Sequence, residues 1–442
     1  MEINIPLHAL KAINLLEQHG FQAYAVGGCI RDSLLGKVPN DWDICTDCSP
    51  AVMKEISQKY RTIETGIKHG TLTVLIDTEL VEITTFRTDG EYENHRKPAK
   101  VEFVDDLYCD LERRDFTINA MCCRKPTEII DFYGGQKDLD NKLIRCVGNA
   151  SQRFEEDALR ILRALRFASV LDFEIHNDTK KAMFEKKQLL QCISGERISE
   201  ELKKLVCGKA AFRVLMEYRE IIAVIIPELK PCFDFDQNNP HHCYDVWTHI
   251  VNSVSNVRPE PVIRIAMLLH DIAKPLVATT DEDGISHFKT HQSKGADMAV
   301  EILKRLRFDN QSITYIHNLI AEHDNRIPAD LRHVKRFISK YDFQFMFDYL
   351  EVRRGDTYAQ SEYRRAEKLA ELDEIARLTL ELSEQDACLK VSDLAVNGND
   401  LIELGLDGKE IGIWLGKLLE LVIDDGIKNE KYELLEYLRD NI

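Results

Sequence analysis

Two glycines and two aspartates near the start of the chain are the residues whose types and spacing best support a chemical role. Gly27 and Gly28 precede a short helical pattern, and Asp41 and Asp43 follow it. Because side chains alternate along a strand, a strand over residues 41–44 would place both carboxylates on one face. Converging carboxylates repel each other unless a cation lies between them. Mg²⁺ suits such a pair, since it is usually held by one or two carboxylates together with substrate phosphates.

The backbone beside this pair could bind those phosphates. A Gly-Gly pair lets the backbone approach a ligand closely, and the helix that follows offers free N–H groups to phosphate oxygens. Phosphate binding beside a metal indicates nucleotidyl or phosphoryl transfer from a nucleoside triphosphate. The alternative is a turn followed by an edge strand with two solvated acids, which an isolated Asp-x-Asp motif favours.

Asp157 and Arg160 could read a base. Three residues apart on a helix, they would share a face. Asp accepts hydrogen bonds and Arg only donates them, which matches the amine and the ring acceptor that cytosine and adenine present. Uracil and guanine present the reverse order and would leave charged groups unpaired. The pair therefore predicts a protein template for C and A, and an intrahelical salt bridge remains the alternative.

Histidines and aspartates form a second group further along the chain. His249 is followed by His270 and Asp271 at the end of an apolar helical pattern, and then by His287, His291, His323 and Asp356. A buried His-Asp pair is costly without a partner, and a metal ion would relieve that cost. Imidazole and carboxylate together suit Mn²⁺, Fe, Ni²⁺, Co²⁺ or Zn²⁺ rather than Ca²⁺. Ordinary surface or core histidines are the alternative.

The elements that must position these residues change character along the chain. Residues 1–145 mix helix and strand patterns, with strands expected at 22–26, 42–46, 71–77, 81–87, 100–104 and 129–132. The strands at 71–77 and 81–87 should form a hairpin, and the polar segment 88–98 should be a mobile loop. From residue 146 onward the pattern is helical almost throughout, with breaks near 227–240 and 389–399.

Composition limits the class of protein. A chain of 442 residues is too long for one core, and its net charge of −17 argues against a protein that simply coats nucleic acid. Lys180 to Arg219 carries ten basic and five acidic residues, so it could follow a phosphate backbone or form a solvated helix face. No membrane span or signal peptide is expected. Twelve scattered cysteines indicate reduced thiols and a cytoplasmic location, and a metal or redox role for Cys45 and Cys48 is the alternative.

Four ordered motifs carry a family resemblance. GGCIRD, NDWDI, RRDFTINA and EEDALRILRALRFA resemble the bacterial class II tRNA nucleotidyltransferase and poly(A) polymerase family over residues 22–205. The resemblance implies that Asp41 and Asp43 bind Mg²⁺ and act with Glu82 as catalytic carboxylates. The implied nucleotide-binding residues are Gly27, Gly28, Arg31, Arg113, Arg114, Asp115, Asn119, Glu156, Asp157, Arg160 and Arg163.

The implied activity is addition of C, C and A to tRNA 3′ ends from CTP and ATP. The segment at 88–98 is similar to the flexible loop of CCA-adding enzymes, which favours full CCA addition over CC addition, A addition or poly(A) synthesis. The acidic tail, with a net charge of −5 over 401–442, resembles a tRNA-binding tail, but its charge favours packing with partial tRNA contact.

The second group resembles the HD phosphohydrolase superfamily over residues 225–365. By that resemblance His249, His270, Asp271 and Asp356 hold one metal, and the reaction is phosphatase or cyclic phosphodiesterase hydrolysis. His291 and His323 would bind a second metal or a substrate phosphate, and Lys274 would contact phosphate. A vestigial domain is one alternative, and an HD phosphohydrolase with a head that only binds RNA is another.

The fold class that follows is α+β. We expect a nucleotidyltransferase head with a mixed β-sheet (1–145), then an all-helical neck that selects the base (146–224), an HD domain (225–370) and a helical tail (371–442). The expected partners are tRNA, CTP and ATP, with no membrane. The oligomeric state stays open.

Overall fold

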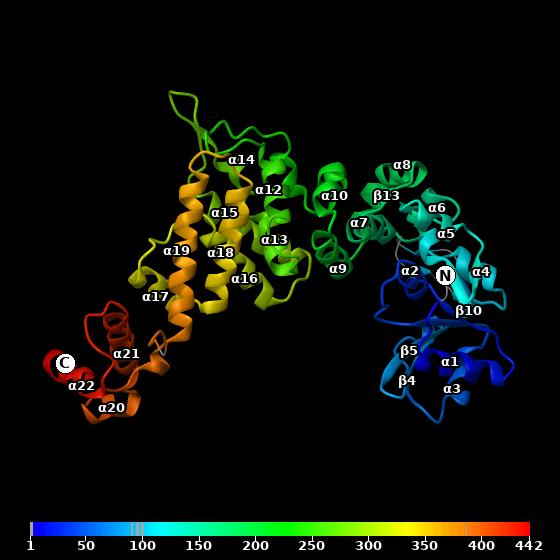
Figure 1. The fold of residues 1–442 in the computed structure, drawn as a ribbon, viewed down its shortest axis with the longest axis horizontal. Helices are drawn as coiled ribbons and strands as arrows, with labels where there is room; N and C mark the ends of the chain where they lie inside the picture. The colour runs from blue at the N-terminus through cyan, green and yellow to red at the C-terminus, as the bar shows by residue number, and fades with distance from the viewer. Residues whose placement is uncertain (1–2, 90–91, 94–96, 99–100, 386) are drawn as a thin grey trace. The chain divides into compact units, whose positions relative to one another are not determined.

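The computed structural model describes residues 3–89, 92–93, 97–98, 101–385 and 387–442. The chain forms two compact units, Met1–Pro227 and Glu228–Ile442. The first unit holds a β-sheet with helices, and the second consists of helices and one small hairpin (Figure 1). The α+β class is therefore confirmed, and the division into four domains stays a prediction. Among the described residues, no helix has both the length and the apolar sequence needed to cross a membrane.

The first unit is built on a mixed seven-stranded sheet. Its strand order is β11-β10-β1-β2-β5-β4-β3, with β2 and β5 parallel and every other neighbouring pair antiparallel. The strands are β1 (Ala23–Val26), β2 (Asp43–Thr46), β3 (Arg61–Ile63), β4 (Thr71–Ile76), β5 (Glu79–Thr85), β10 (Met121–Lys125) and β11 (Glu128–Asp131). All four residues of β1 are buried, as expected for a strand in the middle of a sheet.

The predicted hairpin is confirmed, but its turn is shorter than predicted. Ile76 pairs directly with Glu79, so only Asp77 and Thr78 form the turn. Asp77 has a φ of 56°, a left-handed conformation that Asp tolerates better than most residues. β3 and β10 were not predicted. Of the predicted loop at 88–98, the described parts belong to short antiparallel pairs, and the rest lies outside the described residues.

Those short pairs are β6 with β9 and β7 with β8. Their bounds are β6 (Arg87–Asp89), β7 (Tyr92–Glu93), β8 (Lys97–Pro98) and β9 (Val101–Phe103), and β12 (Leu143–Ile144) pairs with β13 (Glu174–Ile175).

Helices of the first unit carry five of the seven arginines that line its cavity, described below. They are α1 (Leu7–Gln18), α2 (Gly28–Leu34), α3 (Pro50–Ile56), α4 (Leu107–Glu112), α5 (Gly135–Asp140), α6 (Ala150–Glu156), α7 (Leu159–Leu171), α8 (Asn177–Lys186), α9 (Gly195–Val206), α10 (Ala211–Glu217) and α11 (Arg219–Ile225). α1 packs against the sheet and buries Ala9, Ala12, Ile13, Leu15 and Leu16. α7 packs along α9, which brings these two separate segments of the chain to one place.

The cysteines of the Cys45-x-x-Cys48 pair belong to the core. Cys45 lies in a buried cluster with Tyr24, Phe86 and Leu111. Burial raises the pKa of the Cys48 thiol to about 12, so its reactive thiolate form is scarce at neutral pH. Neither thiol belongs to a group of metal-ligating atoms among the described residues.

The second unit is helical, as predicted. Its elements are α12 (Val246–Ser255), α13 (Pro261–Leu269), α14 (Lys274–Val277), β14 (Thr279–Thr280), β15 (Ser286–His287), α15 (His291–Arg305), α16 (Asn310–Glu322), α17 (Leu331–Lys340), α18 (Phe343–Tyr358), α19 (Arg365–Glu384), α20 (Gly398–Glu403), α21 (Gly408–Ile423) and α22 (Lys431–Asn441). α13 packs against α12, α16 and α18, and every residue from Ile263 to Leu269 is buried.

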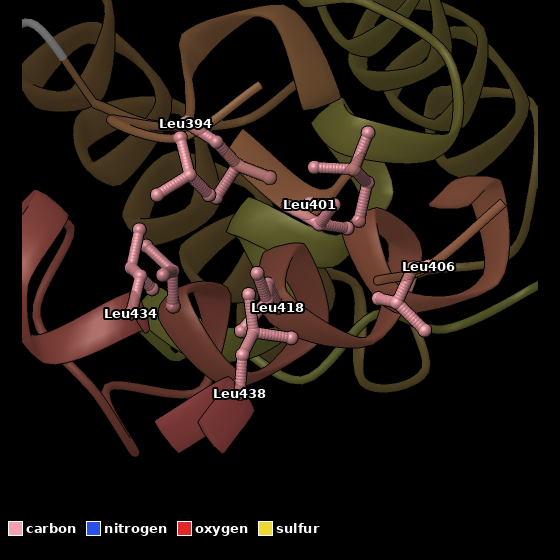
Figure 2. Close-up of a cluster of buried hydrophobic side chains, with 9 residues drawn as sticks. Leu394, Leu401, Leu406, Leu418, Leu434 and Leu438 are labelled. Carbon is pink, nitrogen blue, oxygen red and sulfur yellow. The ribbon is translucent and has the colours of Figure 1, made fainter. Parts of the chain in front are cut away.

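The tail packs around its own leucine core. Leu401, Leu418, Leu434 and Leu438 are fully buried and point toward one another from α20, α21 and α22 (Figure 2). The Asp424 carboxylate also accepts hydrogen bonds from two arginines of α17. The prediction that the tail packs is confirmed, and its contact with tRNA stays a prediction.

Candidate functional site

A cavity of about 510 Å³ in the first unit gathers most of the predicted nucleotide-binding residues. Its lining includes Gly27 and Gly28, four aspartates and seven arginines. The aspartates are Asp41, Asp43, Asp115 and Asp157, and the arginines are Arg31, Arg113, Arg114, Arg160, Arg163, Arg166 and Arg197. Seven positive against four negative charges leave an excess of three, which suits a ligand with several phosphate charges.

The aspartate pair lies at the start of β2. The strand begins at Asp43, one residue after the predicted start at Trp42. The alternation nevertheless holds, because Trp42 is buried while both carboxylates line the cavity. Burial, Asp41 and Glu82 together raise the pKa of Asp43 to about 6. This excess of negative charge fits a divalent cation.

Glu82 lies opposite Asp43 on the neighbouring parallel strand β5. It is exposed and does not line the cavity. Within the described part of the chain, groups of three ligand atoms within 4.8 Å occur only in the second unit. The first unit therefore offers a pair of carboxylates, and Mg²⁺ typically completes such a site with water and substrate phosphates.

Gly27 allows the backbone to approach an arginine of the site. Its φ of 85° is one that residues with a side chain rarely adopt. A Cβ added there would lie 3.0 Å from Arg114 Nη1. The glycine pair therefore leaves room for the guanidinium at the cavity wall.

One buried carboxylate holds two of the arginines. Asp110 is 1% exposed and accepts hydrogen bonds from Arg113 Nη2 at 2.7 Å and from Arg114 Nη2 at 3.3 Å. Burial alone would raise the pKa of Asp110, but the two guanidinium groups overcome that effect and lower it. Asp110 was absent from the predicted site, although the two arginines that directly follow α4 are three and four residues away, the spacing of helical ion pairs.

A second buried carboxylate starts a chain of hydrogen bonds. Asp115 Oδ2 accepts from Arg163 Nε at 2.7 Å, and Oδ1 accepts from Asn119 Nδ2 at 3.0 Å. Asn119 Oδ1 in turn accepts from Arg31 Nη1 at 2.7 Å. Although burial opposes it, Arg163 holds the pKa of Asp115 well below its usual range. Asp115 therefore positions Arg163 and Asn119.

The prediction that Asp157 and Arg160 share a helix face was wrong. α6 ends at Glu156, and Asp157 has an extended backbone with a φ of −135° before α7 begins at Leu159. Asp157 pairs with Arg197 of α9 at 2.7 Å, so the alternative, an intrahelical salt bridge with Arg160, does not form either. Both residues still line the cavity.

Arg160 is held separately. Its Nη1 donates to Glu156 at 2.8 Å and its Nη2 donates to the carbonyl oxygen of Arg113 at 2.7 Å. Glu156 thus supports Arg160 and is not among the cavity-lining residues. The break between the helices allows an acceptor and a donor to face one cavity while each keeps its own partner.

Three arginines surround the ring of Phe167 on α7. The guanidinium carbons of Arg31, Arg163 and Arg166 lie 5.0, 5.6 and 4.1 Å from the ring centroid, distances typical of cation–π contacts. Arg166 also pairs with the buried Glu201 at 3.2 Å. Arg166, Phe167, Arg197 and Leu159 line the cavity but were not predicted as site residues. Three of them stand inside the EEDALRILRALRFA motif, so the motif itself was the available signal.

The basic stretch at 180–219 is largely neutralised. Lys186 pairs with Glu155, Lys187 with Glu220, and Arg213 with Glu174. Much of the excess charge is therefore balanced by acids from neighbouring segments, which weakens the prediction of a continuous phosphate track.

The second unit brings the predicted histidines and aspartates to one centre. His249 Nε2 lies 3.1 Å from Asp271 Oδ2 and 2.9 Å from Asp356 Oδ1, and His270 Nε2 lies 3.2 Å from Asp271 Oδ2. On the other side, His291 and His323 place Nε2 atoms 3.4 and 3.6 Å from Asp271 Oδ1. Asp271 thus belongs to two groups of metal-ligating atoms, one through each oxygen.

Hydrogen bonds to backbone carbonyl oxygens orient the imidazole rings of four histidines. The Nδ1 atoms of His249, His270, His291 and His323 lie 2.6–3.2 Å from the carbonyl oxygens of Ala359, Met267, Phe288 and Ile320. Each Nδ1 donates to its carbonyl oxygen, and this arrangement turns each Nε2 toward the aspartates, as is usual for metal-ligating histidines.

The charge balance of this centre fits metal ions. Neither oxygen of Asp271 accepts a hydrogen bond of good geometry, although the residue is 1% exposed. Burial alone would lower the pKa of His270, but Asp271 and Asp356 raise it to about 10. Lys274 Nζ lies 2.7 Å from Asp271 Oδ2 and lines a cavity of about 450 Å³ over the centre. His287 lines the same cavity without joining either group.

Comparisons with known proteins place this geometry in a family. Residues 23–145 match the family model of the poly A polymerase head domain. Residues 172–233 match the probable RNA and SrmB-binding site of polymerase A, and residues 278–438 match tRNA nucleotidyltransferase domain 2 (putative). The chain is 36% identical over 347 residues to the CCA-adding enzyme of Lactococcus lactis subsp. lactis, an alignment that covers 72% of this chain and 85% of that enzyme.

The chain belongs to the CCA-adding enzyme family of nucleotidyltransferases. It is 48% identical to the CCA-adding enzyme of Bacillus licheniformis over 209 residues, which is 47% of this chain and about half (52%) of that enzyme. Among solved structures, the Bacillus stearothermophilus CCA-adding enzyme in complex with CTP has a TM-score of 0.71 and 27% identity, covering 98% of this chain and 96% of that one. The family resemblance is confirmed, and the family implies a divalent metal.

Replacing Asp110 with asparagine should loosen both arginines. The loss of a buried charged acceptor should lower the free energy of unfolding by about 1.5–3 kcal/mol, and CTP should bind more weakly because Arg113 and Arg114 lose their anchor. Urea denaturation and calorimetric titration with CTP measure the two effects. Asp105→Asn, an exposed carboxylate nearby, is the control. Unchanged CTP affinity in Asp110→Asn would contradict the anchoring role.

The difference in free energy of unfolding between the wild type and Asp110→Asn should also depend on pH. The pKa of Asp110 is lower in the folded chain than in the unfolded chain, so its stabilisation is complete above the unfolded value of about 3.9. It is lost as the pH falls through the lower folded pKa. The gap between the wild type and Asp110→Asn should therefore be constant near pH 7 and shrink below about pH 4.

Proposed function

We propose that this chain adds C, C and A to the 3′ ends of tRNA from CTP and ATP without a nucleic-acid template. The observation that carries the proposal is the single cavity in which a pair of carboxylates, seven arginines and the separately held Asp157 and Arg160 meet. CC addition, A addition and poly(A) synthesis use the same chemistry and are the alternatives that the assay below separates.

Each group of cavity residues has a distinct task. Asp41 and Asp43 would hold Mg²⁺, which when bound polarises the α-phosphate, lowers the pKa of the 3′-hydroxyl and stabilises the leaving pyrophosphate. Arg113, Arg114 and Arg163 bind the triphosphate and ribose, with Asp110 and Asp115 fixing their guanidinium groups. In the reaction the 3′-oxygen bonds to the α-phosphorus as the bond to pyrophosphate breaks.

Asp157 and Arg160 read the base in this proposal. The ion pair of Asp157 with Arg197 leaves carboxylate lone pairs that can accept from the exocyclic amine of cytosine or adenine. Arg160 supplies the donor for the neighbouring ring acceptor. Since both partners are fixed by other residues, a base with the opposite donor order meets unpaired charges, which disfavours U and G.

A gel assay with tRNA ending at the discriminator base tests the activity. With Mg²⁺, CTP and ATP, the wild type should extend the tRNA by C, C and A. Asp41→Ala/Asp43→Ala should fall below about a thousandth of that rate, whereas Glu79→Gln, an exposed carboxylate on β5, should keep it. Stopping after two C residues, requiring a CC end or making long A tracts would reassign the specificity. No extension at all would contradict the proposal.

A second function is favoured by the histidine and aspartate centre. We propose that this centre holds two divalent transition metals, drawn from Mn, Fe, Co, Ni or Zn, and hydrolyses a phosphoester. His249, His270, Asp271 and Asp356 would hold one metal and His291 and His323 the other, with Asp271 shared. When bound, the metals supply an activated water and charge stabilisation. Lys274, held between Asp271 and Gln237, would contact the phosphate.

Two simple substrates test the second function. The metal-replete chain should hydrolyse a model phosphodiester or 2′,3′-cyclic AMP, and Asp271→Ala should lose at least about 100-fold of that rate. The control is Asp297→Asn, an exposed carboxylate on α15. Metal content by mass spectrometry should fall in Asp271→Ala alone. If the metal-replete wild type hydrolyses neither substrate, the hydrolase proposal should be dropped.

The cysteines and the tail bear on the location and the partners of the protein. All twelve cysteines are free thiols, which supports the proposal of a reducing, cytoplasmic environment. Partial contact between the tail and tRNA stays part of the proposal.

A further inference from the structure

A cluster of positive and neutral donors lies beside the metal-ligating centre and takes no part in holding a metal. Lys368 of α19, His241 before α12, Gln360 after α18 and Arg326 after α16 all line the 450 Å³ cavity. We call these four residues the second cradle, the first phosphate position being the metal-ligating centre with Lys274. They come from four different segments, so their convergence arises only in the folded chain.

Hydrogen bonds tie the second cradle to the centre. Gln360 Nε2 donates to Asp356 Oδ2 at 2.8 Å, and Gln360 Oε1 accepts from Lys368 Nζ at 2.5 Å. Lys368 Nζ also lies 3.4 Å from His241 Nδ1. With Nδ1 as an acceptor, His241 is a neutral imidazole whose Nε2 carries the proton and can donate. Lys368 is thus two hydrogen bonds away from a metal ligand.

The cations of the second cradle lack compensating acids. Within the described residues, no carboxylate lies within 4.0 Å of Lys368 Nζ or of the Arg326 guanidinium, and Lys368 is half-buried. Burial, Arg326 and Arg353 lower the pKa of Lys368, and Asp356 and Asp324 only partly oppose them. Beyond the metal-ligating residues, the cavity is lined by four cations, Lys274, Lys289, Arg326 and Lys368, and by one acid, Asp324.

We propose that the second cradle binds a second phosphate group of the substrate, so that the centre acts on a nucleoside carrying one phosphate at the reacting 2′ or 3′ position and another at the 5′ position. This inference rests on the hydrolase function proposed above. One phosphate lies at the metal centre beside Lys274, and the other accepts hydrogen bonds from Lys368, Arg326 and His241. Water adds to the reacting phosphorus, the bond to the ribose oxygen breaks, and that oxygen takes a proton.

Two sources share this chemistry. A free nucleoside bisphosphate carries both phosphates, and so does the terminal nucleoside of an RNA that ends in a 2′- or 3′-phosphate, since its 5′ oxygen carries the chain phosphodiester. In either case a substrate with a single phosphate leaves the second cradle empty.

Steady-state phosphate release from a nucleoside bisphosphate and from a nucleoside monophosphate tests the inference. With the metal-loaded full chain, adenosine 3′,5′-bisphosphate should show a KM at least about tenfold below that of adenosine 3′-monophosphate. Lys368→Gln and Arg326→Gln should each reduce this preference at least about fivefold, mainly through KM, and Lys368→Arg should restore most of it. Lys304→Gln, an exposed lysine of α15, is the matched control. A merely structural role would change both KM values together.

A short RNA with a 3′-phosphate separates the sources. If Lys368→Gln also raises its KM, the cradle serves RNA ends, and if only the bisphosphate responds, it serves free nucleotides. The same substrate preference in the wild type and both variants would overturn the inference. If the wild type releases phosphate from none of them, the hydrolase proposal fails instead. In that case, calorimetric titration with adenosine 3′,5′-bisphosphate tests the second cradle by itself. An unchanged affinity in Lys368→Gln would overturn the inference.

Discussion

Buried positive charge must be held by buried negative charge, and this constraint organises the nucleotide cavity. Asp110 and Asp115 are nearly inaccessible to solvent and together fix Arg113, Arg114 and Arg163. Leaving a buried charge without its partner costs several kcal/mol, so neither acid can be removed without moving the arginines. The acids balance only part of the charge, and the remainder is available to a triphosphate. The sheet and α7 serve to bring these charges to one place.

The metal-ligating centre of the second unit obeys the same constraint with the signs reversed. Asp271 is buried among four imidazoles, and each imidazole is turned by a backbone carbonyl so that its free nitrogen faces the aspartates. Such a centre is costly without cations and consistent with two of them. The two units thus use one physical rule for two chemistries, nucleotidyl transfer in the first and, in our proposal, phosphoester hydrolysis in the second.

The spacing of residues in the sequence predicted those side-chain positions that depend on a single strand or helix. Alternation along β2 gave the aspartate pair, and the apolar run before His270 gave its place at the end of a helix. Spacing failed for Asp157, because an extended residue interrupts the helix and its partner Arg197 is 40 residues away on α9. β10 was missed because its sequence, Met-Cys-Cys-Arg-Lys, holds none of the β-branched or aromatic residues on which strand predictions depend. Lys368, Gln360 and Arg326 carry no motif, since only the packing of α16, α18 and α19 brings them together.

In our proposal, fixed protein groups select the incoming base, so a change in one of these groups should change the choice between CTP and UTP. The measurement is the relative kcat/KM for CTP and UTP on a tRNA ending at the discriminator base, in the wild type and in Asp157→Asn. A carboxylate only accepts, whereas an amide can also donate to the O4 carbonyl of uracil. The account predicts that Asp157→Asn lowers the preference for CTP at least about tenfold. An unchanged ratio in an active, folded variant would contradict it.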